Sequence, residues 1–233
     1  MNIQSAVIEG ANILKNSYIQ TAQLDTEILM AKVLCSNREY IILNNHKDLN
    51  DNNLEYFKRL IRERANRKPI AYLLNKKFFW DSEFYVNKNT LIPRPDTEVI
   101  IEEILRLTKH KNKLNILDIG VGSGCILLTI LKERKNFYGT GIDISKKSLD
   151  ISKINAKNLN VDERTKFYKS DIDKFAQGKY DLIVSNPPYI KSCDLKYLER
   201  DVINFEPKLA LDGGLDGLSE IRKVINKSSE LIK

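Results

Sequence analysis

An asparagine, two prolines and a tyrosine stand together as Asn186-Pro187-Pro188-Tyr189, directly after a stretch apolar enough to be a buried strand. An amide nitrogen is a poor nucleophile because its lone pair is delocalised, so it must be oriented before it can react. The Asn186 side-chain oxygen and the Pro187 carbonyl can each accept one N–H of such a nitrogen. The prolines stiffen the loop, and Tyr189 can stack on a planar group. We interpret Asn186, Pro187 and Tyr189 as catalytic, and all four residues as substrate-binding.

A glycine-rich run follows another apolar stretch and opens a helical pattern. Asp118 and Ile119 are followed by Gly120, Val121, Gly122, Ser123 and Gly124. Glycines allow a tight turn and a close approach of backbone to ligand, and free N–H groups at a helix start favour an anionic group. The glycines alternate, unlike a dinucleotide fingerprint, and the pattern resembles motif I of S-adenosylmethionine methyltransferases. By itself the run is also compatible with a nucleotide site or a structural turn.

Two further acids end the next two predicted strands. Asp143 can accept hydrogen bonds from ribose hydroxyls, and Asp171 can accept one from an adenine amino group, with Ile172 packing on the ring. A single aspartate in this place is more often a helix cap. Ligands of open α/β sheets bind beyond the carboxyl ends of the strands, and three signals in consecutive units favour a cofactor site.

Alternating strands and helices position these residues. Apolar runs predict strands, and the stretches between the first three predict helices. The predicted strands are Asn115–Ile119, Phe137–Ile142, Lys166–Lys169 and Tyr180–Ser185, with helices at Cys125–Glu133 and Lys146–Asn158. This alternation predicts a parallel sheet with right-handed crossovers. A helix starting near Pro95 or Asp96 should precede the first strand.

The residues before this sheet predict a separate helical domain. Residues 1–76 show helical spacing of apolar residues, and two short aromatic runs predict a β-hairpin linker at 77–92, before the methyltransferase domain at 93–233. We expect Pro69 to end the third helix. That helix carries basic residues that form either a solvated face or a surface for nucleic acid or the ribosome: Lys58, Arg59, Arg62, Arg64, Arg67 and Lys68.

Composition narrows the function classes. The three cysteines are unpaired in spacing and the two histidines lie outside any cluster, so we expect no metal site and no Ser-His-Asp apparatus. No apolar run reaches a membrane span and no signal peptide is visible, so we expect a cytoplasmic protein. The formal net charge of +7 suits an acidic partner without identifying one.

Several motifs together resemble the release factor glutamine methyltransferases. They occur in that family's order along nearly the whole chain: residues 69–73 (PIAYL), 90–98 (TLIPRPDTE), 186–190 (NPPYI) and 205–207 (FEP). The resemblance implies transfer of a methyl group from S-adenosylmethionine to the glutamine amide nitrogen in the Gly-Gly-Gln motif of class I peptide chain release factors. It implies a Rossmann-like α/β methyltransferase sheet, and a small N-terminal helical domain that helps to hold the protein substrate. Stable nucleic acid binding and membrane association are not expected.

Carried over by position, the resemblance implies cofactor contacts at residues 120–124, 143, 171, 172 and 186. The family usually has an aromatic residue at position 172, so Ile172 gives apolar contact without stacking. Arg94 is expected to face the cofactor or substrate, or to form a salt bridge within its loop. The chain ends at Lys233, after the helix that follows the fourth strand. We therefore expect a C-terminally incomplete sheet with strand order 3-2-1-4, which leaves the fourth strand at an edge.

Two other functions stay open at this point. The Asn-Pro-Pro-Tyr segment at 186–189 is shared with adenine-N(6) methyltransferases, which act on a flipped base of DNA or RNA. The chain has no obvious target-recognition domain for such a substrate. A non-catalytic, truncated remnant that binds a partner is the second alternative.

Overall fold

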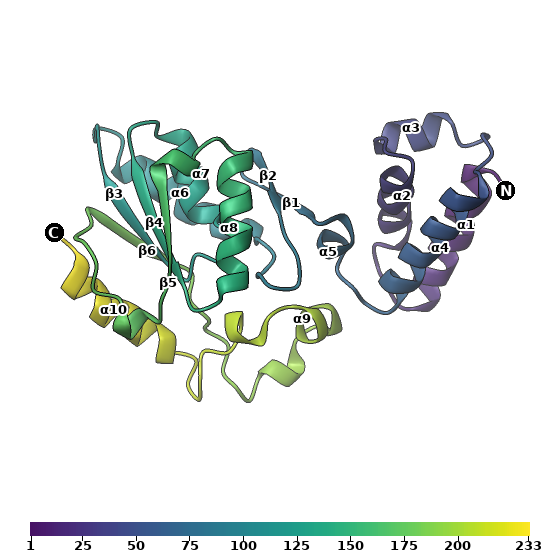
Figure 1. The fold of residues 1–233 in the computed structure, drawn as a ribbon. Coiled ribbons are helices and arrows are strands. Elements are labelled where there is room, and N and C mark those ends of the chain that lie inside the picture. The colour runs from purple at the N-terminus through teal and green to yellow at the C-terminus, as the bar shows by residue number, and fades with distance from the viewer. The chain divides into compact units, whose positions relative to one another are not determined.

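Five helices form the first unit of the chain. The computed structural model describes residues 1–233 and separates into the units Met1–Leu74 and Asn75–Lys233 (Figure 1). The helices of the first unit are α1 (Ile3–Asn16), α2 (Ala22–Val33), α3 (Arg38–Leu43), α4 (Asp51–Ala65) and α5 (Ile70–Leu74). Asparagine side chains accept from free backbone N–H groups at the starts of α1, α3 and α4, which stabilises these helix starts.

The basic helix of the first unit differs from its expected form in two ways. It is α4, which ends at Ala65, and Pro69 instead precedes the short helix α5. Arg64 is not part of a solvated face: its Nε lies 2.7 Å from Oδ2 of Asp25 on α2, and both side chains are buried. A guanidinium this deep requires a partner because desolvation penalises an unpaired charge.

A β-hairpin begins the second unit. Its strands β1 (Lys76–Phe79) and β2 (Ser82–Tyr85) pair antiparallel. Phe79 and Phe84 meet edge to face, with ring centroids 6.1 Å apart, and belong to the main core of this unit. Asn155 accepts from the backbone N–H of Tyr85 at 2.7 Å and donates to the carbonyl of Ser123 at 2.8 Å. The hairpin is thereby tied to the glycine-rich run.

The four predicted strands form one parallel sheet in the predicted order. The strands are β3 (Asn115–Ile119), β4 (Tyr138–Asp143), β5 (Thr165–Lys169) and β6 (Leu182–Ser185), in the order β5-β4-β3-β6. The α-helices of this unit are α6 (Glu98–Leu107), α7 (Cys125–Glu133), α8 (Lys146–Asn158), α9 (Arg200–Phe205) and α10 (Ser219–Leu231). The 3₁₀ turns are η1 (Pro95–Thr97), η2 (Asp162–Arg164), η3 (Ile172–Lys174), η4 (Leu195–Tyr197) and η5 (Lys208–Ala210).

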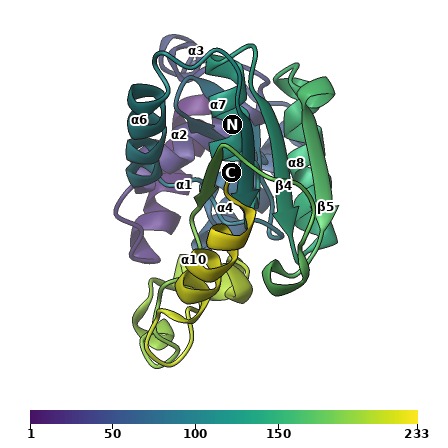
Figure 2. The same ribbon diagram turned by 90° about the vertical axis from the view of Figure 1, so that its left-hand side faces the viewer.

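Apolar side chains cover both faces of this sheet. Ile116 of β3 packs into a core with α6, α7 and α8. Its neighbour Leu117 points to the opposite face and packs with Ile172, Phe175 and Leu231. Figure 2 shows α10, which carries Leu231, on the side of the strands that faces the viewer. Both faces of the sheet are therefore covered, as is typical of parallel sheets with apolar strands.

The final residues of the chain run beside the start of the outer strand. Tyr180 N donates to Leu231 O at 2.9 Å, and Lys233 N donates to Tyr180 O at 3.0 Å, in a parallel bridge. Within β6 itself, only β3 is a paired neighbour. No helix of the structure is long and apolar enough to span a membrane.

We predict that Arg64→Met destabilises the helical unit by about 3–5 kcal/mol, because the Asp25 carboxylate would stay buried without its partner. Urea unfolding followed by circular dichroism on residues 1–233 measures this change. Arg62→Met on the exposed side of the same helix is the control and should cost little. Equal decreases in the free energy of unfolding of the two variants would show that the buried ion pair does not contribute specifically to stability.

Candidate functional site

A cleft of about 440 Å³ opens at the carboxyl ends of the parallel strands. This volume lies within the range of small-molecule sites. Ten of the predicted site residues line it: Gly120, Val121, Gly122, Ser123, Asp143, Asp171, Ile172, Asn186, Pro187 and Pro188. Gly124 and Tyr189 are not among the lining residues. Four separate segments of sequence thus converge on one cavity.

The glycine loop is shaped by left-handed backbone and by bonds to the neighbouring strand. Gly120, Gly122 and Gly124 have φ of +76°, +57° and +84°, which other residues rarely adopt. A Cβ on Gly124 would also lie 2.7 Å from Cδ1 of Leu128. The N–H groups of Gly120 and Val121 both donate to the carbonyl of Ile142 at 2.9 Å. Gly124 therefore shapes the loop from behind the cleft.

Asp143 holds the same loop through its carboxylate. Its Oδ2 accepts from Gly122 N at 3.0 Å and its Oδ1 accepts from Ser145 N at 2.8 Å. Burial raises the pKa of Asp143, and the two backbone N–H groups act against that rise. A carboxylate offers about four acceptor positions, so two remain for a ligand in the cleft.

Asp171 is both a cap and a cleft residue. Its Oδ1 accepts from Asp173 N at 3.2 Å, which caps the turn η3. Ile172, the first residue of that turn, is buried and packs on the sheet while it lines the cleft. The helix-cap alternative is therefore correct for Asp171, and it is compatible with a position at the cavity.

Asp118 is a cleft residue that the sequence reasoning did not assign to the site. It is 1% exposed, and its Oδ2 has no hydrogen-bond partner in the protein. Burial raises the pKa of Asp118 to about 7; the Leu127 N–H opposes this shift and the charge of Asp143 adds to it. Perturbed carboxyls in clefts are typical of functional sites. The signal in the sequence was an acid two residues before the first glycine.

Asn186 is oriented by a hydroxyl from a distant segment. Its Nδ2 lies 3.5 Å from Oγ1 of Thr97, a buried residue of η1. With the amide nitrogen directed to Thr97, the amide oxygen is free to accept a hydrogen bond in the cleft. Ser185, one residue earlier, donates its hydroxyl to Ile119 O at 2.7 Å, which ties the end of β6 to the end of β3.

The backbone after Asn186 is packed against a second glycine-containing loop. A Cβ on Gly213 would lie 2.8 Å from Cα of Tyr189 and 2.9 Å from the carbonyl oxygen of Pro188. Gly213 N donates to Ile190 O at 2.8 Å. Only glycine permits this approach, so the loop supports the Pro-Pro-Tyr backbone from one side. Tyr189 is 64% exposed, and its stacking role stays a prediction.

Arg94 lines the cleft and forms a salt bridge, but with a distant residue and not within its own loop as expected. Its Nη2 lies 2.5 Å from Oε1 of Glu206, whose side chain is only 1% exposed. Oε2 of Glu206 accepts from Ile92 N at 3.0 Å. Glu206 therefore braces the loop around Pro93 against the segment that begins at Pro207, and both prolines line the cleft. The sequence alone could not predict this salt bridge, because its two residues are 112 positions apart.

Family models match both units of the chain. The Methyltransferase small domain matches residues 96–209, and the PrmC N-terminal domain matches residues 5–74. The release factor glutamine methyltransferase of Clostridium acetobutylicum is 35% identical over all of this chain and 83% of the relative's length. The release factor glutamine methyltransferase of Geobacter sulfurreducens is 37% identical over 92% of this chain and 74% of its own length.

One solved structure shares the fold of a large part of this chain. The catalytic domain of hMettl16, solved in complex with MAT2A 3'UTR hairpin 6, superposes with a TM-score of 0.53 and 17% identity. The match covers 64% of this chain and 58% of that chain. This likeness shows the fold alone.

We predict that the stability of the ligand-free protein falls as pH rises from about 4 to 7, in part because of Asp118. Its folded pKa of about 7 lies above the usual aspartate value of 3.8, which applies to the unfolded chain. In that window the unfolded chain has released the proton while the folded chain retains it. The free energy of unfolding therefore falls as pH rises, by at most roughly 1.4 kcal/mol per pH unit.

Asparagine does not titrate, so the Asp118→Asn variant should lack this part of the pH dependence. The stability of the variant relative to the parent protein should therefore rise between pH 5 and pH 8. Denaturant unfolding at both pH values measures the difference. A variant whose relative stability is the same at both would rule out a protonated Asp118 in the folded protein.

Proposed function

The chain belongs to the release factor glutamine methyltransferase family, and we propose that it methylates class I peptide chain release factors. The acceptor would be the side-chain amide nitrogen of the glutamine in their Gly-Gly-Gln motif, and the methyl donor S-adenosylmethionine. One observation carries this proposal: a single cleft is lined by the glycine loop, three strand-end carboxyls and Asn186-Pro187. In this proposal the donor and acceptor sites are adjacent.

The residues of the cleft fit the chemistry of S-adenosylmethionine. The cofactor carries an ammonium, a sulfonium and ribose hydroxyls, all of which favour acceptors or negative charge. Asp118 offers a buried oxygen without a partner, and Asp143 offers free acceptor positions. Ile172 supplies an apolar wall for adenine beside Asp171. When bound, the cofactor supplies an electrophilic methyl group.

The chain's own groups would orient the nucleophile. The Asn186 oxygen and the Pro187 carbonyl each accept one N–H of the glutamine amide, which aims the nitrogen lone pair along the cleft. Thr97 holds the Asn186 amide in the orientation that this requires. Fixed dipoles in a partly closed site need no reorganisation during reaction. No strong base is needed before transfer, because the amide proton can leave afterwards.

Three substrates would test the proposed acceptor. Radiolabelled S-adenosylmethionine is supplied with a class I release factor, with duplex DNA and with RNA in parallel. We expect label on the release factor, at the glutamine of its Gly-Gly-Gln motif by mass spectrometry. A release factor in which that glutamine is replaced by alanine is the control. Label on adenine in DNA or RNA would favour the nucleic acid alternative, and no label on any substrate would favour a non-catalytic partner-binding protein.

We predict that Asp143→Asn weakens S-adenosylmethionine binding by about 1.5–3 kcal/mol, the range for hydrogen bonds to a charged group. Asparagine keeps an oxygen that can accept from Gly122 N, so the loop is disturbed less than by alanine. Isothermal titration calorimetry measures the affinity. Asp150→Asn on the exposed side of α8 makes the same charge change away from the cleft and should leave affinity unchanged. Unchanged affinity in Asp143→Asn would remove Asp143 from the cofactor site.

We predict that Asn186→Ala lowers the methyl transfer rate about a hundredfold or more, because the nitrogen loses one of its two positioned acceptors. The melting temperature should be largely preserved. Single-turnover assays on a release factor measure the rate. Thr97→Val should lower it less, since it affects only the orientation of Asn186. Near-normal turnover of Asn186→Ala would mean that the amide is held by other groups.

A further inference from the structure

The last helix contributes one wall of the cleft. Glu220, Lys223 and Val224 on the N-terminal half of α10 line the cavity together with Asp171 and Ile172. Val224 also packs against the apolar cluster that contains Ile172. The helix and the turn η3 are therefore neighbours at the end of the cleft where Asp171 lies.

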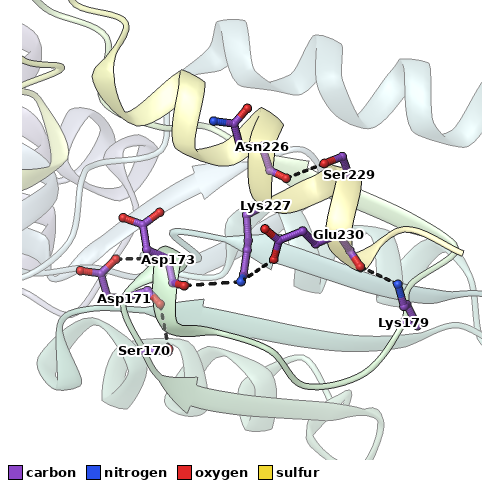
Figure 3. Close-up of polar contacts among 8 residues, drawn as sticks. All are labelled: Ser170, Asp171, Asp173, Lys179, Asn226, Lys227, Ser229 and Glu230. Atoms are coloured by element: carbon purple, nitrogen blue, oxygen red, sulfur yellow. Dashed lines mark hydrogen bonds and ion pairs between the residues drawn. The ribbon is translucent and has the colours of Figure 1, made fainter.

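A buried lysine connects this helix to the turn. Lys227 is 9% exposed, and its Nζ lies 3.4 Å from the carbonyl oxygen of Asp173 in η3 and 2.8 Å from Oε2 of Glu230. Figure 3 shows Lys227 pointing from α10 to the Asp173 carbonyl, beside Asp171 and its capping bond. Lysine is almost never buried without partners, and Lys227 is not itself a cleft residue.

Opposite charges on α10 and on the turn η3 also favour packing of the helix against the turn. The ion pair with Glu220 raises the pKa of Lys223, and the carboxylates of Asp173 and Asp171 add to that rise. Two lysines one helical turn apart thus face the turn, one toward its carboxylates and one toward its backbone. The carboxylates of the turn attract the first lysine, and a carbonyl of the turn accepts from the second.

The far end of the helix is anchored by a second set of contacts, which involves the backbone carbonyl of Glu230 and not its side chain. Lys179 donates from Nζ to Glu230 O at 2.5 Å (Figure 3). Tyr180 N also donates to Leu231 O. These contacts fix α10 to the start of β6, away from the cleft. A helix fixed at that end can hold the turn in place through Lys227.

We propose that Lys227 is a positioning residue for cofactor binding: from α10 it fixes the turn that carries Asp171 and Ile172, and so sets the shape of the adenine end of the cleft. This inference rests on the proposed function, because it takes S-adenosylmethionine as the ligand. Lys227 touches neither reactant and acts only through the turn. Loss of its ammonium would let the turn move and would enlarge that end of the cavity.

Calorimetry with S-adenosylhomocysteine on the full chain tests this role. Lys227→Met keeps the apolar stem and should raise Kd roughly tenfold, the order of one charge-assisted hydrogen bond. Lys179→Met is the matched control: it removes a lysine contact to the same helix at the anchored end, and should change Kd by less than about twofold. Lys227→Gln provides a second, milder variant should Lys227→Met fail to fold.

A double-variant cycle separates positioning from general destabilisation. Ile172→Ala and Lys227→Met should be non-additive in Kd, because both act on the same turn. Ile172→Ala and Lys179→Met should be additive. Equal effects of the two lysine variants, or additivity in both cycles, would overturn the positioning role while leaving the proposed function intact. A parent chain that does not bind S-adenosylhomocysteine would overturn both. Normal binding, with the expected cycles but no transfer to release factors, would overturn only the proposed function.

Discussion

The N–H groups of the glycine loop donate to the end of the neighbouring strand, and the geometry of the cleft depends on this anchor. Gly120 and Val121 donate to the Ile142 carbonyl, and Gly122 donates to the Asp143 carboxylate. Parallel pairing of β3 with β4 brings these atoms together, since it aligns Ile119 with Ile142. The side chain proposed to bind ribose therefore also shapes the loop proposed to face the rest of the cofactor. Ligand contacts and loop conformation are coupled at Asp143.

Local sequence was sufficient to predict the sheet and most of the cleft. The run from β3 to β6 alternates apolar strands with helices, and β3, α7 and α8 begin and end where the pattern placed them. Strand order and parallel pairing bring the strand ends to one edge, so the glycine run, Asp143 and Asp171 were predicted to share a site from local sequence, and Asn186 was placed with them through the family resemblance. Two short helices of the first unit, α3 and α5, were missed because segments of five or six residues carry too little periodicity.

The features that local sequence did not predict are contacts between residues far apart in the chain. Nothing in the residue types of Arg64 and Asp25 indicates that they are in contact. The sequence of a helix rich in Lys and Arg predicts a solvated face, and only the folded structure shows that one of these residues pairs with a buried acid. Glu206 is similar: its carboxylate binds Ile92 N and Arg94, and only the folded chain brings them within reach. The loop at Gly213 supports the backbone at Pro188 through a close backbone contact. Local secondary-structure propensity does not predict this contact.

Two basic groups of the cleft are paired with acids, whereas one of its buried acids has an oxygen without a partner. Arg94 is paired with Glu206, and Lys223 with Glu220. Asp118, by contrast, has an oxygen without a partner, and burial raises its pKa to about 7. A cation that enters would favour the ionised form of Asp118 and draw the pKa down again. The free energy lost by burying this carboxyl is thereby partly recovered on binding, because the desolvated acid gains a counter-charge in a site of low dielectric. A neutral ligand of the same shape would lack this charge–charge stabilisation, so the buried acid favours a cationic cofactor.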